Sequence, residues 1–143
     1  MNPHALAEQL ITEHPVEFRM GGCSMYPTLR ADDWAIVKRC EDATKIRPGD
    51  IVAFRSGENC LVCHRVVKIK NTNVGRIFIS KGDNSVSYDQ PFTADQIFGI
   101  IISYKHNDKK ISINSLRMKF LRFAFLYFSW FAQKGYRVIG KMC

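Results

Sequence analysis

After Pro15 the chain breaks into short apolar runs, and a cluster of turn-forming residues follows most of them. These clusters contain glycine, proline, asparagine or aspartate, each of which favours turns for its own backbone reason. Short apolar runs at this spacing predict strands, so we expect a mainly β fold, a coiled antiparallel barrel or sandwich. The runs are PVEFRM, DWAIVKR, DIVAFR, CLVCHRVVKIK, RIFISK and IFGIIISYK.

Helical spacing of apolar residues occurs near the two ends of the chain. Residues 4–13 place their apolar side chains on one side, and Pro15 ends this pattern. The pattern from Leu116 onward is also helical, but it is apolar on too many sides for a simple surface helix. We expect one catalytic domain at residues 1–114, which begins with a short helix, and an aromatic, basic and amphipathic helical tail at residues 115–143.

The formal net charge of +8 is concentrated in this tail. Residues 115–143 carry six basic residues and no acidic one, which leaves +2 for the rest of the chain. The same segment is rich in phenylalanine, and a basic and apolar mixture suits an anionic membrane surface at least as well as nucleic acid. We therefore expect a membrane partner for the tail and no nucleic acid. The alternative is a helix that packs on the β core or on a second subunit.

Cysteine usage and hydropathy indicate where the protein works. The five cysteines form an odd set, and no apolar export segment follows the first methionine. The longest uncharged apolar stretch, residues 123–133, is shorter than the roughly 20 residues that a membrane-spanning helix needs. We expect a cytoplasmic protein, or one peripherally associated with a membrane.

One serine lies in a setting that suits nucleophilic chemistry. Ser24 follows a glycine pair and precedes the proline turn at Pro27, directly after an expected strand. A serine hydroxyl needs a base to remove its proton at neutral pH. Of the four histidines, only His64 lies inside a strand-like run, where neighbouring strands hold a ring in place. Ser24 and His64 are therefore the candidate nucleophile and base.

Five segments, taken in order, resemble the conserved boxes of the signal peptidase I superfamily, the S24/S26-type serine peptidases. The histidine at the base position resembles the Ser-His branch of the endoplasmic-reticulum and archaeal enzymes, whereas bacterial housekeeping relatives have lysine there. Several boxes in the right order are more specific than any single motif. The segments are SMYPTL at 24–29, RPGDIV at 47–52, HRVV at 64–67, KGDN at 81–84, and Asp89.

This resemblance implies the family's β-rich catalytic core and hydrolysis of a peptide bond through an acyl-enzyme on Ser24. His64 matches the general base, and Asp89 matches the acid that orients it. Asp83 of the KGDN segment is the competing acid, because geometry rather than sequence order decides which carboxylate completes a triad. The implied substrate is a protein with a cleavable leader, signal or propeptide, with small side chains near the cut.

The surroundings of the nucleophile complete the implied site. Ser24, Met25 and Pro27 match the positions that contact substrate and the oxyanion. Many bacterial relatives have a hydroxyl two residues before the nucleophile, where this chain has Gly22. The oxyanion hole is therefore expected to consist of backbone N–H groups that include Ser24. The mechanism requires no metal and no organic cofactor.

Two alternatives remain open. A self-cleaving repressor-type peptidase shares the fold and the serine, but it usually pairs serine with lysine and adds a DNA-binding domain. We expect no room for such a domain in the short segment before the first strand. A redox or haem module based on Cys60-x-x-Cys63-His64 is the other alternative. It requires an oxidising compartment and leaves the SMYPTL and KGDN segments unexplained, and strand alternation would place the two cysteines on opposite faces.

Overall fold

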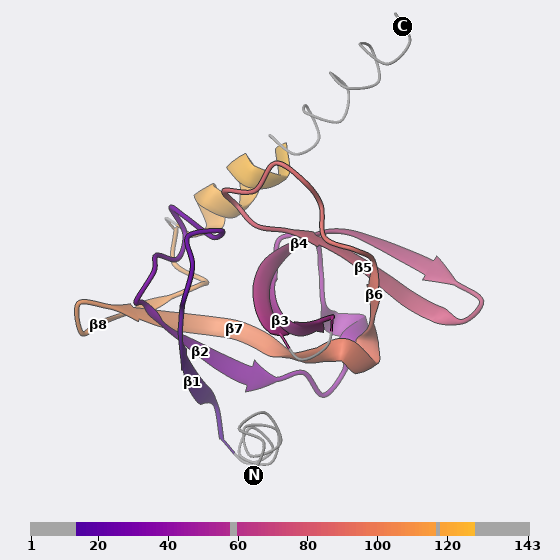
Figure 1. Cartoon of the computed structure of the whole chain (residues 1–143), viewed down its shortest axis with the longest axis horizontal. Helices are drawn as coiled ribbons and strands as arrows, with labels where there is room; N and C mark the ends of the chain where they lie inside the picture. Colours follow the sequence, from indigo (N-terminus) through magenta and orange to yellow (C-terminus); the bar gives the residue numbers. More distant parts are fainter. Residues whose placement is uncertain (1–13, 58–59, 117, 128–143) are drawn as a thin grey trace, which may run out of the picture.

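The computed structural model describes residues 14–57, 60–116 and 118–127, and its main feature is one antiparallel sheet (Figure 1). The prediction of a mainly β fold is confirmed. The expected helix at residues 4–13 lies outside the described residues. The strands are β1 (Val16–Arg19), β2 (Trp34–Arg39), β3 (Ile51–Ser56), β4 (Cys60–Thr72), β5 (Gly75–Lys81), β6 (Phe92–Thr93), β7 (Ile97–His106) and β8 (Lys109–Ser112), and the short 3-10 helices are η1 (Ala43–Lys45) and η2 (Ala94–Gln96).

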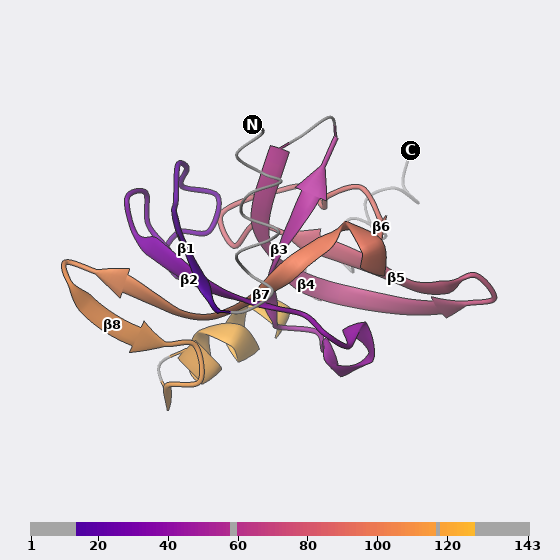
Figure 2. The same ribbon diagram turned by 90° about the horizontal axis from the view of Figure 1, so that it is seen from below.

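The sheet follows the order β1-β2-β7-β3-β4-β5-β6, and β8 pairs with β7 outside this path. Every pairing is antiparallel. Among the described residues the path has two ends, at β1 and β6, so the sheet is open and not a closed barrel. The long β4–β5 hairpin and the β7–β8 hairpin extend from opposite ends of the molecule (Figure 2).

The core consists of two apolar clusters, and β3 contributes to both. Ile51 and Ala53 lie in one cluster, while Val52 and Phe54 lie in the other. Successive side chains of a strand point to opposite faces, so a central strand that is covered on both faces has a continuous apolar sequence. This burial explains why the DIVAFR run lacks the polar and apolar alternation of a half-exposed strand.

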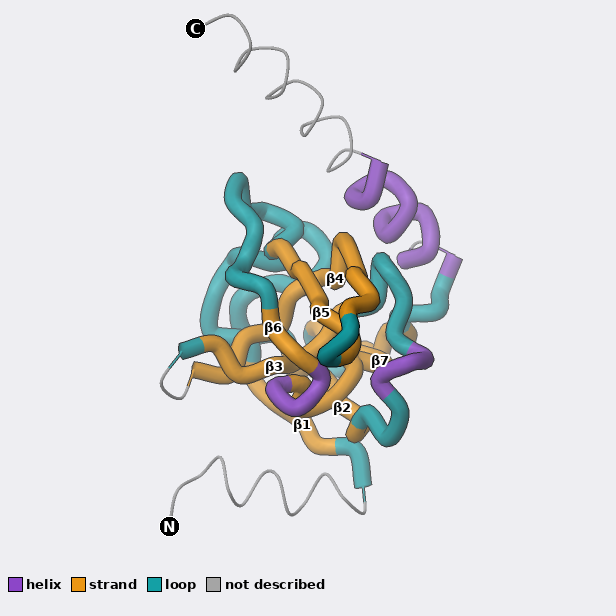
Figure 3. Tube along the Cα trace, turned by 90° about the vertical axis from the view of Figure 1, so that its right-hand side faces the viewer, coloured by secondary structure: helices purple, strands orange, loops and turns teal. Residues whose placement is uncertain are grey.

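The expected C-terminal helix is present at residues 116 and 118–127 and lies on the outside of the strand-rich body (Figure 3). Met118 is buried in the first core cluster, and Leu121 packs against that cluster. Residues 128–143 lie outside the described part, and the domain boundary at residue 115 stays a prediction. In the described ranges, no helix combines the length and apolar character needed to cross a bilayer.

Candidate active site

A cleft lies between two strand edges that the sheet leaves unpaired in the described chain. β1 pairs only with β2, and β4 pairs with β5 only from Arg65 onward, so the first residues of β4 pair with β3 alone. The cleft is therefore bounded by backbone groups and by largely apolar side chains. Its lining residues are Phe18, Arg19, Met20, Gly21, Gly22, Ser24, Leu61, Val62, Cys63 and His64.

The loop that carries Ser24 is fixed from within the fold. Met25 and Leu29 are fully buried in the core, and the Leu29 N–H donates to the Met25 carbonyl at 3.0 Å. The Tyr26 N–H donates to the Cys23 carbonyl at 3.1 Å, which closes a turn around the serine. Ser24 is thus anchored by the apolar residue that follows it, while its own side chain reaches the cleft.

His64 lies between a hydroxyl and a carboxylate. Its Nε2 is 3.0 Å from Ser24 Oγ, and its Nδ1 is 2.7 Å from Asp89 Oδ2. The register of β3 and β4 pairs His64 with Val52, and the Phe54 ring packs edge-on at 6.4 Å between centroids. The side chain is 12% exposed, so the imidazole is held in one orientation but remains open to the cleft.

Asp89 is held by β5 as well as by the histidine. Its N–H donates to the Ser80 carbonyl at 2.9 Å, and the Ser80 hydroxyl donates to Asp89 Oδ2 at 2.5 Å. Partial burial acts to raise the pKa of Asp89, but the hydrogen bonds from His64 and Ser80 outweigh it, so the pKa lies below its ordinary value. The carboxylate is therefore stabilised in the ionised form that orients a histidine.

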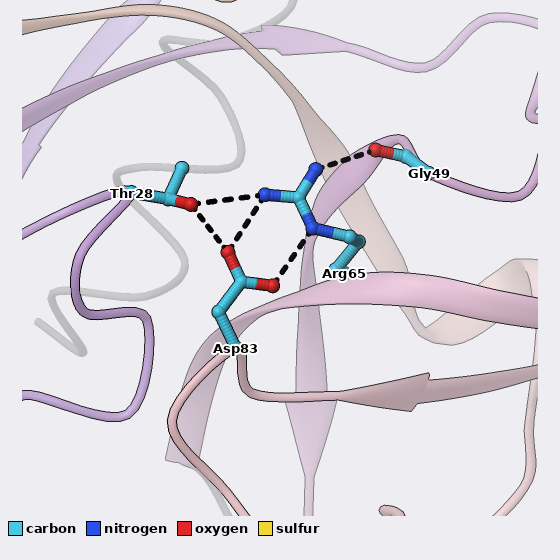
Figure 4. A network of polar contacts seen from close by, with 4 residues as sticks. All are labelled: Thr28, Gly49, Arg65 and Asp83. Atoms are coloured by element: carbon cyan, nitrogen blue, oxygen red, sulfur yellow. Dashed lines mark hydrogen bonds and ion pairs between the residues drawn. The ribbon is translucent and has the colours of Figure 1, made fainter. Parts of the chain in front are cut away.

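Asp83, the competing acid, binds Arg65 (Figure 4). Arg65 donates to both Asp83 oxygens at 2.7 Å, and both side chains are 2% exposed. The same guanidinium donates to the Gly49 carbonyl at 2.9 Å and to the Thr28 hydroxyl at 3.2 Å. Thr28 in turn donates to Asp83. This buried network joins the turn before β3, the nucleophile loop and the KGDN turn.

The KGDN turn also contacts the nucleophile loop through its backbone. The Asn84 N–H donates to the Ser24 carbonyl at 2.7 Å. Gly82 lies so close that a Cβ there would be 2.7 Å from the Ser24 carbonyl oxygen, so only glycine fits without displacing the loop. The KGDN turn therefore positions Ser24, even though its aspartate does not contact His64.

The other predicted site residues occupy varied positions. Met25 belongs to the core, and neither Met25 nor Pro27 lines the cleft, so a role for them in substrate binding stays a prediction. Burial raises the pKa of Cys63 to about 12, which keeps this thiol protonated at neutral pH. Cys60 and Cys63 lie on one continuous strand, three residues apart, and therefore face opposite sides. In the described ranges no cluster of three or more metal-binding side chains occurs.

Sequence analysis missed three parts of the site. Nothing in the local sequence distinguishes Ser80, the second partner of Asp89. Thr28 and Arg65 lie inside segments that carried the resemblance, and the alternation along β4 was the available indication that Arg65 faces away from His64. The apolar walls of the cleft, such as Phe18 and Leu61, looked like ordinary strand residues.

A β-rich body presents a serine, an imidazole and a carboxylate in a hydrogen-bonded row beside a cleft, which is the arrangement of groups in a hydrolytic triad. The chain matches the Peptidase S24-like family over residues 5–102, more than half of its length, and belongs to that family. It is also 30% identical over 73 residues to signal peptidase I W of Bacillus subtilis (strain 168). That match covers 51% of this chain and 38% of the relative, so the chain spans less than half of the relative's length. No solved structure showed a significant match.

Proposed function

We propose that the protein is a serine endopeptidase that removes a leader, signal or propeptide from a protein substrate. The observation that carries the proposal is the contact of His64 with Ser24 on one side and with Asp89 on the other. An isolated serine or histidine is usually structural. A nucleophile and base within hydrogen-bonding reach, with a third group that orients the base, form a working unit.

In the proposed reaction Ser24 Oγ attacks the scissile carbonyl carbon while His64 Nε2 accepts the hydroxyl proton. The imidazolium then donates this proton to the leaving amine, which leaves an acyl group on Ser24. A water molecule then attacks the acyl carbon and gives a proton to the same nitrogen. The bond between the acyl carbon and Ser24 Oγ breaks, the imidazolium returns the proton to Ser24 Oγ, and the acid product leaves. Throughout, Asp89 accepts the Nδ1–H and stabilises the imidazolium charge.

The oxyanion that forms on the carbonyl is proposed to bind backbone N–H groups. Gly22 carries no hydroxyl, so a side-chain donor two residues before the nucleophile is absent. The Ser24 N–H lies beside the attacking oxygen within a loop that the core and the KGDN turn hold in place. Fixed donors of this kind stabilise a developing charge without reorganising during the reaction.

The cleft supports an extended polypeptide as substrate. The edges of β1 and β4 that are unpaired among the described residues offer backbone N–H and C=O groups to an added strand, and the lining between them is apolar apart from Arg19, Ser24 and His64. Phe18, Met20, Leu61 and Val62 are the larger apolar residues of its lining, beside the Cys63 thiol. This is the setting in which small or apolar residues of a leader fit beside the scissile bond.

The test is digestion of a library of unstructured peptides, with products identified by mass spectrometry. The Ser24→Ala variant should cleave at least about 10⁴-fold more slowly than wild type, because removal of one triad member disables the unit. Ser87→Ala, which removes an exposed serine outside the cleft, is the matched control and should cleave as wild type does. Cleavage by Ser24→Ala at the wild-type rate would refute the proposal.

Self-cleavage is the second candidate, and the match to the S24-like family favours it. The same three side chains would then act on a segment of their own chain. Intact mass measured over time distinguishes the two, because self-cleavage within one molecule proceeds at a rate independent of protein concentration. Cleavage of added peptides by an undegraded chain identifies an enzyme that acts on other molecules.

A further inference from the structure

The C-terminal helix is attached to the body through one face. Arg122 donates to the Pro48 carbonyl at 2.8 Å and lies 3.3 Å from Asp50. The Phe125 ring lies 5.6 Å from the Arg65 guanidinium carbon. With Met118 in the core, these contacts fix the rotation of the helix about its axis. The side chains on the opposite face of the helix are therefore held away from the body.

The outward face is apolar. Leu116, Phe120 and Phe123 are 86%, 73% and 73% exposed and are spaced by four and three residues, so they form one stripe on a helix. We call these three residues the outer stripe. Single exposed apolar residues are ordinary, but a contiguous row of large ones marks an interaction surface.

The segment of chain that contains the outer stripe carries formal charge of one sign. Asp108 is the last acidic residue of the chain, and eight of the 21 Lys and Arg residues follow it. Residues 1–108 therefore carry thirteen basic and thirteen acidic residues, Asp108 included, and have no formal net charge. The whole excess of +8 thus belongs to the segment that contains the helix, where Lys119 is exposed beside the stripe.

We infer that the outer stripe docks on the surface of an anionic lipid bilayer, with the helix lying in the membrane plane. An apolar face flanked by basic residues is the pattern of an interfacial helix, in which phenylalanine and leucine enter the acyl boundary and lysine meets the headgroups. A second copy of the chain fits less well, because self-association would bring two acid-free basic segments together. This inference concerns a surface outside the cleft and holds whether or not Ser24 acts as a nucleophile.

The direct test is sedimentation of the full chain with vesicles of phosphatidylcholine, with and without phosphatidylglycerol. We expect strong binding to the anionic vesicles at low salt, weak binding to the neutral ones, and release as salt is added, because ions screen the contribution of lysine and arginine. Absence of binding to anionic vesicles at low salt overturns the inference.

Two sets of variants assign the binding to this surface. Phe120→Ser and Phe123→Ser should each weaken vesicle binding about tenfold, from the apolar area withdrawn from lipid. Lys119→Gln should weaken it about fivefold. The matched controls are Val74→Ser, at a residue that is 89% exposed at the tip of the β4–β5 hairpin, and Lys70→Gln on the same hairpin. Binding lost equally in the controls overturns the assignment to the helix.

Light scattering on a sizing column tests the competing partner. A monomer whose vesicle binding depends on Phe120 and Phe123 supports the inference. A dimer that Phe120→Ser dissociates, together with vesicle binding that the same change leaves intact, shows that the stripe pairs two chains and overturns it. Because both phenylalanines are exposed, their replacement should leave the thermal midpoint unchanged.

Discussion

His64 and Arg65 are neighbours on β4, and each is bound to an aspartate from the segment that follows β5. The His64 and Asp89 side chains are 12% and 24% exposed and share one contact of 2.7 Å. The Arg65 and Asp83 side chains are both 2% exposed and share two hydrogen bonds of 2.7 Å. The two pairs differ in access to water and in the number of bonds.

That difference matches the roles proposed for the two pairs. In the proposed reaction the imidazole exchanges a proton with the substrate, so it needs an opening to the cleft. Guanidinium stays protonated, and its planar fork matches a carboxylate in a fixed geometry. The His64 side of β4 therefore suits chemistry, while the Arg65 side holds Thr28 and Gly49 and keeps the loops in register.

The largest effect should come from replacing Asp89, the aspartate that contacts His64. Asp89→Asn should lower kcat by about 10³ to 10⁴, because an amide neither fixes the Nδ1–H tautomer nor stabilises an imidazolium. It should leave the fold intact. Measurement of kcat/KM and of urea unfolding on Asp89→Asn and Asp83→Asn separates the roles. Loss of activity in a fully stable Asp83→Asn protein, with Asp89→Asn active, would reverse the assignment.

A smaller but still large effect should be seen in stability on the other side of β4. Arg65→Met leaves Asp83 buried without its partner and should cost about 3–5 kcal/mol of unfolding free energy. The double variant Arg65→Met with Asp83→Leu should recover much of this loss, because no buried charge then remains unpaired. Arg39→Met, at an exposed arginine of β2, is the control. If Arg65→Met costs no more than this control, the network does not stabilise the fold.

The smallest effect should be the acid sensitivity that Asp89 contributes. Hydrogen bonds from His64 and Ser80 hold the pKa of Asp89 below its ordinary value, so the folded state binds this proton less readily than the unfolded chain does. The resulting stabilisation is fully present above the unfolded value of about 3.9 and is lost as the pH falls through the lower folded value. The free energy of unfolding, measured with urea from about pH 6 to about pH 3, should therefore change less with pH for Asp89→Asn than for wild type. If the unfolding free energies of Asp89→Asn and wild type change equally with pH, with Asp108→Asn as the reference variant, Asp89 makes no such contribution.

Part of the fold and part of the site were predictable from the sequence. The strand runs and their turns predicted the mainly β fold, because each depends on residues within a few positions of one another. Ser24 and His64 were chosen from their local settings, and Asp89 from the order of the segments. The structure brings all three together, and their catalytic roles stay part of the proposal. For the tail, one face of the helix packs on the core, as one of the two alternatives expected. The membrane partner, the other alternative, stays a prediction.

By itself the sequence determined the strands that match the six apolar runs, the turns between them and the chemical groups available to the site, whereas β6 and β8 lie outside those runs. Only the tertiary structure decided that Asp89 rather than Asp83 reaches His64. Asp83 is nearer to His64 along the chain, and both acids follow closely on β5. The register of β4 with β5 pairs Arg65 with Lys81 and Val66 with Ser80, and Ser80 then holds Asp89 at the imidazole. Register depends on contacts between distant segments and on the alternation of faces, and a shift of one residue would move His64 and Arg65 to the opposite faces of the sheet.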